Sequence, residues 1–346
     1  MKKIRFLAAL LGFGVMLSTA VSAFTDMPAD EKLANALNNA VANGILSGYP
    51  EDDTIRPDNP ITRAEMASII TRACGATVEG NISGFGDMNP EKWYYPPMAK
   101  AYSMGAFSGD DKKNMNPENN ITFQECFTVL SRVFDLYPEY TYNPAIEALV
   151  DLPETKLYSP SDRRLYDVSI IFNYPDGADV AAWARPFYAG LLANGAWSGE
   201  NGYLTPTQNI TRGQFATVMN NIVQNYIDAA GTYTELPAGN TMIRCNDVIL
   251  EGVKADGSVY VADGVGFQRF AANNVALARL VVRGCSSPLG ENGKPVSKDI
   301  GLKLSGRIDR LRIVGSNISV NVSEVVHDYP IYSSPTTSIN LGNVSF

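Results

Sequence analysis

The sequence predicts a multi-domain protein in which an all-α region precedes an all-β region. The all-α region would consist of three helix-loop-helix repeats around a three-helix bundle. Two observations support this fold class: one sequence unit occurs three times between residues 24 and 230, and the period of the apolar residues changes from 3.6 to 2 after residue 240. A chain of 346 residues is long enough for two or three domains.

Composition excludes several classes of function. The chain has 36 acidic against 28 basic residues, a formal net charge of −8, and a single histidine, His327. One histidine cannot build a multi-His metal site, and a Ser-His-Asp arrangement would have to use that residue. The acidic balance argues against nucleic-acid binding. We therefore predict no metal, no cofactor and no nucleic-acid partner.

Residues 1–23 have the composition of a secretory signal peptide. Basic residues at positions 2, 3 and 5 precede an apolar run from Phe6 to Met16 and small residues that end at Ala23. A membrane anchor, the alternative, needs about 18 or more apolar residues, and this segment is marginal for that. Cleavage before Phe24 changes the net charge from −8 to −11. We expect a secreted chain without membrane insertion after cleavage.

The repeated unit contains three marker groups in a constant order. It opens on an aromatic residue and an Asp, continues with a Gly-x-x-x-Gly element 18 or 19 residues after the Asp, and ends in an Ile-Thr pair. The Asp residues are Asp26, Asp87 and Asp176, and the first glycines are Gly44, Gly105 and Gly195. These units define module 1 (24–75), module 2 (85–137) and module 3 (172–230), with an insertion of mixed character at 138–171.

Each module is predicted to contain two helices. The first helices span about residues 29–43, 94–104 and 182–194, and the Gly that follows each is expected in a left-handed conformation. Each second helix starts at a capping box, a Thr followed three residues later by Glu or Gln. The boxes are Thr62 with Glu65, Thr122 with Glu125, and Thr211 with Gln214. Every second helix carries one apolar stripe, which a shared bundle would bury.

The order of these motifs resembles the S-layer homology (SLH) module. Thr62 to Glu65 keep its Thr-Arg-Ala-Glu signature intact. The resemblance implies a pseudo-trimer that anchors a secreted protein non-covalently to pyruvylated secondary cell-wall polysaccharide, a polymer attached to peptidoglycan. It also implies a location in the cell wall or S-layer, with copies of the chain as candidate partners.

The resemblance further implies that the polymer lies in grooves between modules. The expected contacts are the motif Arg, the early Asp, the Trp, and the backbone near the first Gly. In this sequence these residues are Arg63, Arg212, Asp26, Asp87, Asp176, Trp93, Trp183, Gly44, Gly105 and Gly195.

Arg63 and Arg212 are candidates on physical grounds as well. Each occupies the first position of a predicted helix, where free N–H groups already favour an anion and a guanidinium can bind a carboxylate with two hydrogen bonds. A cation there costs the helix about 0.3–1 kcal/mol, which points to a function. The alternative is a surface Arg paired with a nearby acid. Phe123 occupies this position in module 2 and cannot bind an anion, so we expect one or two working grooves.

The other candidate contacts leave two interpretations open. Trp93 and Trp183 could stack on sugar rings or could anchor the core at a helix start. The three Asp residues could accept hydrogen bonds from sugar hydroxyls or could cap the next turn.

The C-terminal part changes character. Residues 231–240 have the composition of a linker, and residues 241–346 contain short β-branched runs separated by Gly, Asn or Asp. Similar fragments begin at Val281 and Ile313, which suggests stacked coils of about 20 residues. We predict a short right-handed parallel β-helix, with a β-sandwich as the alternative.

Catalysis is not expected. The acids of the β-rich part are scattered, and His327 beside Asp328 is more typical of a solvated loop. The alternative function is an envelope polysaccharide-processing enzyme tethered by its SLH modules. Cys74 and Cys126 are predicted to be buried and reduced. Cys245 and Cys285 stand 40 residues apart, so stacked coils could bring them together.

Overall fold

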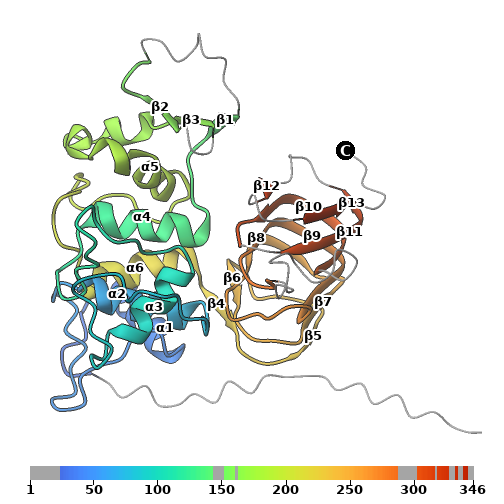
Figure 1. The fold of residues 1–346 in the computed structure, drawn as a ribbon, viewed down its shortest axis with the longest axis horizontal. Coiled ribbons are helices and arrows are strands. Elements are labelled where there is room, and N and C mark those ends of the chain that lie inside the picture. The colour runs from blue at the N-terminus through green and yellow to red at the C-terminus, as the bar shows by residue number, and fades with distance from the viewer. Residues whose placement is uncertain are drawn as a thin grey trace, which may run out of the picture.

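The computed structural model describes residues 24–142, 152–159, 163–286, 302–315, 318–326, 332–333 and 338–341. A helical region and a β region lie side by side in it (Figure 1). The segment predicted to be a signal peptide, 1–23, lies outside the described residues. The predicted solvated loop at His327 does so as well.

Each module contains the two predicted helices. The first helices are α1 (Glu31–Ala42), α3 (Tyr95–Ser103) and α5 (Arg185–Ala193), and the second helices are α2 (Arg63–Ala73), α4 (Phe123–Phe134) and α6 (Arg212–Ile222). In module 3 the predicted first helix is divided. A 3-10 turn, η4 (Ala182–Ala184), precedes α5, whose start has no side-chain cap and whose first turn contains Pro186.

All three predicted capping boxes are present. At α2, the Thr62 hydroxyl accepts a hydrogen bond from the backbone N–H of Glu65, and the Glu65 carboxylate accepts one from the backbone N–H of Thr62. The same exchange occurs at the starts of α4 and α6. A Thr cap of this type contributes about 1 kcal/mol to stability.

A ring of backbone hydrogen bonds joins the three modules where the second helices start. Ile61 donates to the carbonyl of Ile210, Ile210 donates to Ile121, and Ile121 donates to Ile61, at 3.0–3.1 Å. The predicted shared axis is therefore present at the helix starts. Along their lengths, however, the helices pack between modules: α2 on α3, α4 on α5, and α6 on α1. Each groove is consequently built by more than one module.

The insertion between modules 2 and 3 forms a small antiparallel sheet in its described part. Its strands are β1 (Tyr140–Tyr142), β2 (Lys156–Ser159) and β3 (Arg164–Asp167), in the order β1-β3-β2. The guanidinium of Arg164 is buried and lies over the rings of Tyr137 and Tyr140. Two short 3-10 turns, η2 (Ser169–Asn173) and η3 (Gly177–Asp179), lead from this sheet to η4.

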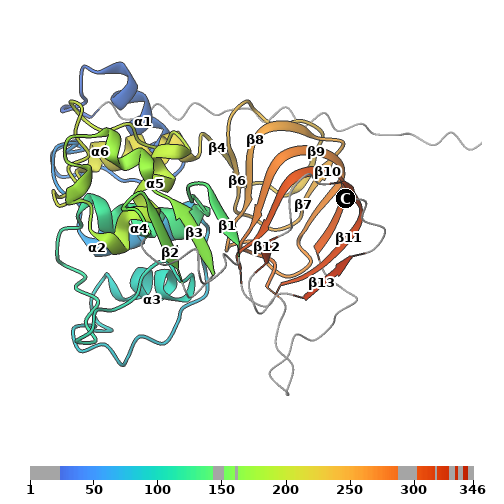
Figure 2. The same cartoon turned by 90° about the horizontal axis from the view of Figure 1, so that it is seen from above.

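The β region is a curled parallel sheet (Figure 2). Its strands are β4 (Asn225–Ile227), β5 (Gly231–Tyr233), β6 (Thr241–Ile243), β7 (Val248–Glu251), β8 (Lys254–Val261), β9 (Phe270–Val282), β10 (Leu302–Ile313), β11 (Ser319–Val326), β12 (Tyr332–Ser333) and β13 (Ser338–Leu341). The main order is β13-β11-β10-β9-β8-β6-β4. Parallel pairing is compatible with a β-helix and not with the antiparallel sandwich considered as the alternative. The two similar fragments are neighbours, because Val282 pairs with Ile313.

This sheet begins earlier than the sequence predicted. Strand β4 lies inside the predicted module 3 (172–230) and pairs with β6, and β5 lies inside the predicted linker (231–240) and pairs with β7. The predicted boundaries were therefore wrong here. Strands of three residues are too short to show a period of 2, so only their pairing reveals them.

Arginines of the β region bind the carboxyl ends of the module helices. Arg244 donates to the carbonyls of Asn43 and Arg72, at 2.9 and 3.2 Å. Arg283 donates to those of Met104 and Arg132, at 2.7 and 3.1 Å. The last carbonyls of a helix lack partners within the helix and carry its negative end, so guanidinium groups satisfy them well. These contacts connect the two regions directly.

Asp135 strengthens this junction. It follows α4 with a φ of 54°, is buried, and accepts hydrogen bonds from Arg312 at 2.6 and 3.0 Å and from Arg279 at 3.2 Å. The carboxylate raises the pKa of the Arg312 guanidinium against the opposing effect of burial. Removing it would leave buried cations without their anion.

The cysteines are free. Cys74 and Cys126 are buried and unpaired, as predicted. Cys245 and Cys285 are unpaired as well, so the bridge considered between stacked coils is absent. Burial raises the pKa of the Cys285 thiol to about 12.

Candidate functional site

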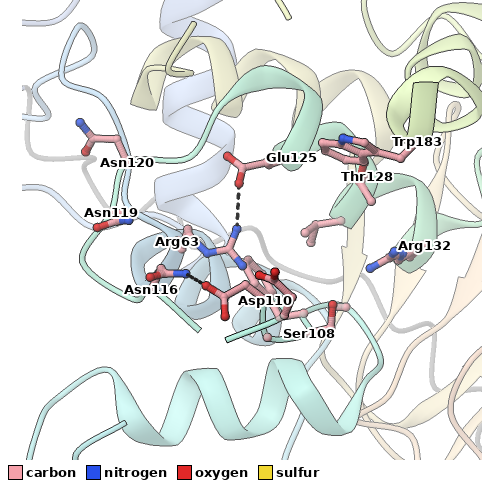
Figure 3. Close-up of a pocket in the computed structure, with 15 residues that line it drawn as sticks. Arg63, Ser108, Asp110, Asn116, Asn119, Asn120, Glu125, Thr128, Arg132 and Trp183 are labelled. Carbon is pink, nitrogen blue, oxygen red and sulfur yellow. Dashed lines mark hydrogen bonds and ion pairs between the residues drawn. The ribbon is translucent and has the colours of Figure 1, made fainter. Parts of the chain in front are cut away.

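A pocket of about 880 Å³ lies between the start of α2, the loop before α4, and α4 itself (Figure 3). We call it groove A. Residues from all three modules line it: Arg63 from module 1, Asp110, Asn116, Glu125 and Arg132 from module 2, and Trp183 from module 3. Arg63, Asp110 and Asn116 lie on one side of the pocket, and Arg132 and Trp183 lie on the other.

Arg63 is the first residue of α2, as predicted, but its guanidinium is partly committed to protein partners. Nε donates to the carbonyl of Met115 at 2.9 Å, and Nη1 pairs with the Glu125 carboxylate at 3.3 Å. The side chain is only 15% exposed, and this loss of hydration lowers the pKa of the guanidinium. Arg63 therefore ties module 1 to the loop of module 2 while it lines the groove.

The Arg212 side chain is more deeply buried, and its guanidinium is hydrogen-bonded within the protein. It is 5% exposed, and its guanidinium donates to the carbonyls of Ile55 at 2.8 Å and Ser47 at 2.7 Å. Its guanidinium also lies over the Tyr49 ring. Arg212 thus ties module 3 to the loop of module 1, as Arg63 ties module 1 to module 2. Its contact with a polymer stays a prediction.

The three motif Asp residues brace loops far along the chain. Asp26 accepts hydrogen bonds from the backbone N–H groups of Ile55 and Arg56, both at 2.7 Å. Asp87 holds Met115 and Asn116 in the same way, and Asp176 holds Leu204 and Thr205. Arg56, Asn116 and Thr205 each have a φ of 51°. The carboxylates thus stabilise a left-handed backbone in the loop, rather than capping the next turn.

Both candidate tryptophans are exposed. Trp93 is 60% exposed and Trp183 is 53% exposed, so neither anchors the core. Trp183 lies at the wall of groove A, next to Thr128 and Arg132 (Figure 3). An exposed aromatic face beside polar side chains is suited to a sugar ring.

The glycines have the predicted backbone conformation. Gly44, Gly105 and Gly195 follow the first helices with φ values of 64°, 68° and 69°. The second glycine of the element has a different role, which the sequence did not reveal. A Cβ at Gly109 would lie 2.2 Å from the Phe85 ring, so the motif aromatic packs directly on this position.

The pocket that corresponds to groove A at the start of α4 has a different chemistry. We call it groove B. It has a volume of about 530 Å³ and is lined by acids, amides and hydroxyls, including Asp179, Glu200 and Gln214, without a basic residue. Phe123 is 1% exposed and packs on Trp197, with ring centroids 5.3 Å apart. These features fit the expectation that this groove does not bind an anion.

One lining residue of groove A was missed in the sequence analysis. Arg132 lies in the last turn of α4, is exposed, and has its guanidinium 5.4 Å from the centre of the Phe187 ring. Within the described ranges it pairs with no carboxylate. Its position nine residues after the helix start is a signal that a comparison of the three modules could have found, because module 1 has Arg72 there.

Comparisons with known proteins agree with this architecture. The family model for the S-layer homology domain matches residues 23–67 and 84–125. The Surface-layer 125 kDa protein of Lysinibacillus sphaericus is 28% identical over 198 residues, which is 56% of this chain and 14% of that protein. An Amylopullulanase of Thermoanaerobacterium thermosulfurigenes is 24% identical over 174 residues, or 50% of this chain and 8% of the enzyme. A Surface layer protein of Brevibacillus choshinensis is 27% identical over 113 residues, or 32% and 10%.

The chain thus spans at most about a seventh of the length of these relatives. Within its described part, no helix is both long and apolar enough to cross a membrane. The domain match and the surface-layer relatives indicate a secreted protein of the cell surface. The chain therefore contains S-layer homology domains: two are matched directly, and a third unit shares their capping box and loop geometry.

Proposed function

We propose that the helical region anchors the chain non-covalently to the bacterial cell wall by binding an anionic, pyruvylated secondary cell-wall polysaccharide in groove A. The observation that carries this proposal is the composition of the groove: two guanidinium groups and an exposed Trp line one pocket together with amide, hydroxyl and carboxylate side chains. A guanidinium binds a carboxylate through paired hydrogen bonds, and an indole face covers a sugar ring. The β region would then be displayed at the surface or contribute to an S-layer.

The net charge of the chain indicates that attraction to an anionic polymer must be local to the groove. The chain without residues 1–23 would carry a net charge of −11, so as a whole it repels an anionic polymer. Charges are screened over about 8 Å at physiological salt, so only charges near the polymer act on it. The guanidinium groups of Arg63 and Arg132 must therefore bind its carboxylate beside three acids that also line the groove, Asp110, Asp111 and Glu125. We expect binding to weaken as salt rises but to persist at physiological ionic strength.

The alternative, a tethered polysaccharide-processing enzyme, has less support. The amylopullulanase relative is matched over only 8% of its length. In the β region, Asp247 pairs with Arg269, Asp263 with Arg283 and Asp309 with Arg307. Carboxylates held in ion pairs are poor candidates for general acid and base catalysis. Release of soluble sugars from wall glycans incubated with the full chain would nevertheless favour this alternative.

Sedimentation with purified cell walls tests the proposal. The chain should pellet with native walls of the producing organism and stay in solution with walls stripped of pyruvyl groups by mild acid. The double variant Arg63→Ala, Arg212→Ala should pellet less, and its thermal melting must be followed because Arg212 is buried. Arg269→Gln, an exposed Arg in the β region, is the matched control. Equal binding to both wall preparations would refute the proposal.

A further inference from the structure

We propose that Arg132 and Arg72 bind the acidic group of the wall polysaccharide in two equivalent grooves, and that groove B binds none. This inference rests on the proposed function and assigns its anion contact to residues outside the SLH signature. The corresponding position at the start of α6, where Arg212 and Arg72 both lie near Ser47, is called groove C.

The backbone ring establishes which positions are equivalent. Because Ile61, Ile121 and Ile210 occupy equal places in it, the helix starts Arg63, Phe123 and Arg212 also correspond. Nine residues further along, the corresponding residues are Arg72, Arg132 and Asn221. Twelve residues before the first glycines Gly44, Gly105 and Gly195, they are Lys32, Trp93 and Trp183.

Each groove takes its equivalent residues from three different modules. Groove A takes Arg63, Arg132 and Trp183 from three different modules. The same three-fold operation places Arg212, Arg72 and Trp93 in groove C. It places Phe123, Asn221 and Lys32 in groove B. Two grooves therefore have two Arg and one Trp, and one groove has none of the three.

Hydrogen bonds support this assignment independently. Arg72 Nη1 lies 3.5 Å from the Ser47 hydroxyl, and the carbonyl of the same Ser47 accepts from Arg212. The two arginines of groove C are therefore within reach of one residue. Asn221 donates to the carbonyl of Ala196 at 3.1 Å, on the loop that lies next to groove B.

In grooves A and C, the two arginines differ in their solvent exposure and in their protein partners. The signature arginines are largely buried and bonded to main-chain carbonyls, with Glu125 as a further partner of Arg63. Arg132 and Arg72 are exposed, and neither pairs with a carboxylate among the described residues. An incoming anion meets, at Arg132 or Arg72, a guanidinium that has no carboxylate partner among the described residues. The signature arginines then position the loops that shape the groove.

The placement of Arg132 also suits a binding role. A cation in the last turn of a helix is stabilised by the helix dipole, so the guanidinium can be held ready without cost to the fold. The carbonyl of Arg132 accepts a hydrogen bond from Arg283 of the β region, which fixes the helix end. Figure 3 shows the Arg132 side chain reaching toward the pocket below Trp183.

Titration calorimetry of the full chain with soluble pyruvylated polysaccharide fragments tests this assignment. The wild type should bind two fragments per chain. Arg132→Gln and Arg72→Gln should each retain one site and weaken the other about 10- to 100-fold, the effect of losing a charge-assisted hydrogen bond. The double variant should lose both sites. Arg132→Lys should recover part of the affinity, because it keeps the charge but not the paired geometry.

The controls separate this inference from the proposed function. Asn221→Ala, in groove B, and Arg269→Gln, in the β region, should both bind like the wild type. Melting temperatures of Arg132→Gln and Arg72→Gln should stay close to that of the wild type, because both side chains are exposed. Wild-type affinity and two sites in Arg132→Gln would overturn this inference alone, as would three sites in the wild type. Absence of binding by the wild type would overturn both.

Discussion

Groove A and groove B are built on the same framework, and acids and amides line both, but only groove A is also lined by arginines and a Trp. Both have a capping box, a left-handed loop held by an Asp, and an aromatic side chain packed on the second glycine. They differ at two corresponding positions: Arg63 and Arg132 line groove A, whereas Phe123 is buried and Asn221 donates a hydrogen bond to the carbonyl of Ala196. Residues that hold the backbone therefore recur in every module, whereas the arginines that we propose bind a ligand do not.

In groove B another side chain donates the hydrogen bond that the signature Arg donates in groove A. In groove A, Arg63 satisfies the carbonyl of Met115, and in groove B the hydroxyl of Tyr188 satisfies the corresponding carbonyl of Leu204. Phe123 then fills the remaining space against Trp197. Burial raises the pKa of the Tyr188 phenol well above its usual range, so this donor stays protonated.

The largest effect, a loss of stability, is expected when groove B is given an Arg at the position that Phe123 occupies. Phe123→Arg would place a guanidinium in a buried aromatic site whose nearest carbonyl already has a donor. An unpaired buried charge costs about 3–5 kcal/mol, and urea denaturation should show that loss. Wild-type stability together with an additional polysaccharide site would show that the two grooves are interchangeable.

The Asp residues that bind the loop backbone should contribute equally to stability in both grooves. Asp87→Ala and Asp176→Ala each remove a carboxylate that accepts backbone hydrogen bonds, with an expected loss of about 2–3 kcal/mol in the free energy of unfolding. Only Asp87→Ala should also weaken polysaccharide binding, because it loosens the loop of groove A. A loss in one variant more than twice that in the other would contradict a shared framework.

The helix caps provide a smaller test of the same idea. Thr62→Ala, Thr122→Ala and Thr211→Ala should each lower the free energy of unfolding by about 1 kcal/mol. Chemical denaturation of the three variants side by side measures it. Replacement by Ser, which keeps the capping hydroxyl, is the control and should restore most of the loss.

The smallest effect is expected at the exposed Trp of groove A. Trp183→Ala should change the free energy of unfolding by less than about 0.5 kcal/mol, as is usual for surface positions. It should weaken polysaccharide binding about threefold, near the lower end of aromatic contact energies. Lys32→Trp adds a Trp at the corresponding position of groove B and should gain no binding. A gain would show that Trp alone makes a groove functional.

Local patterns predicted the helical region well. The three capping boxes, the left-handed glycines and the first-position arginines depend on neighbouring residues, and all were found where expected. Contacts distant in sequence were not predicted. Asp26, for example, binds backbone groups nearly 30 residues away, and the Arg244 contacts with Asn43 and Arg72 join the two regions.

The repeat, its helices and its loop chemistry can be inferred from the sequence alone, because capping and turn formation are satisfied within a few residues. Which modules share a groove depends on tertiary packing. The backbone ring joins the three helix starts and each second helix packs on the first helix of another module, so Arg63, Arg132 and Trp183 line one pocket although they belong to three different modules. Side chains that face a pocket carry no local periodic signal, and the pocket exists only after the modules close.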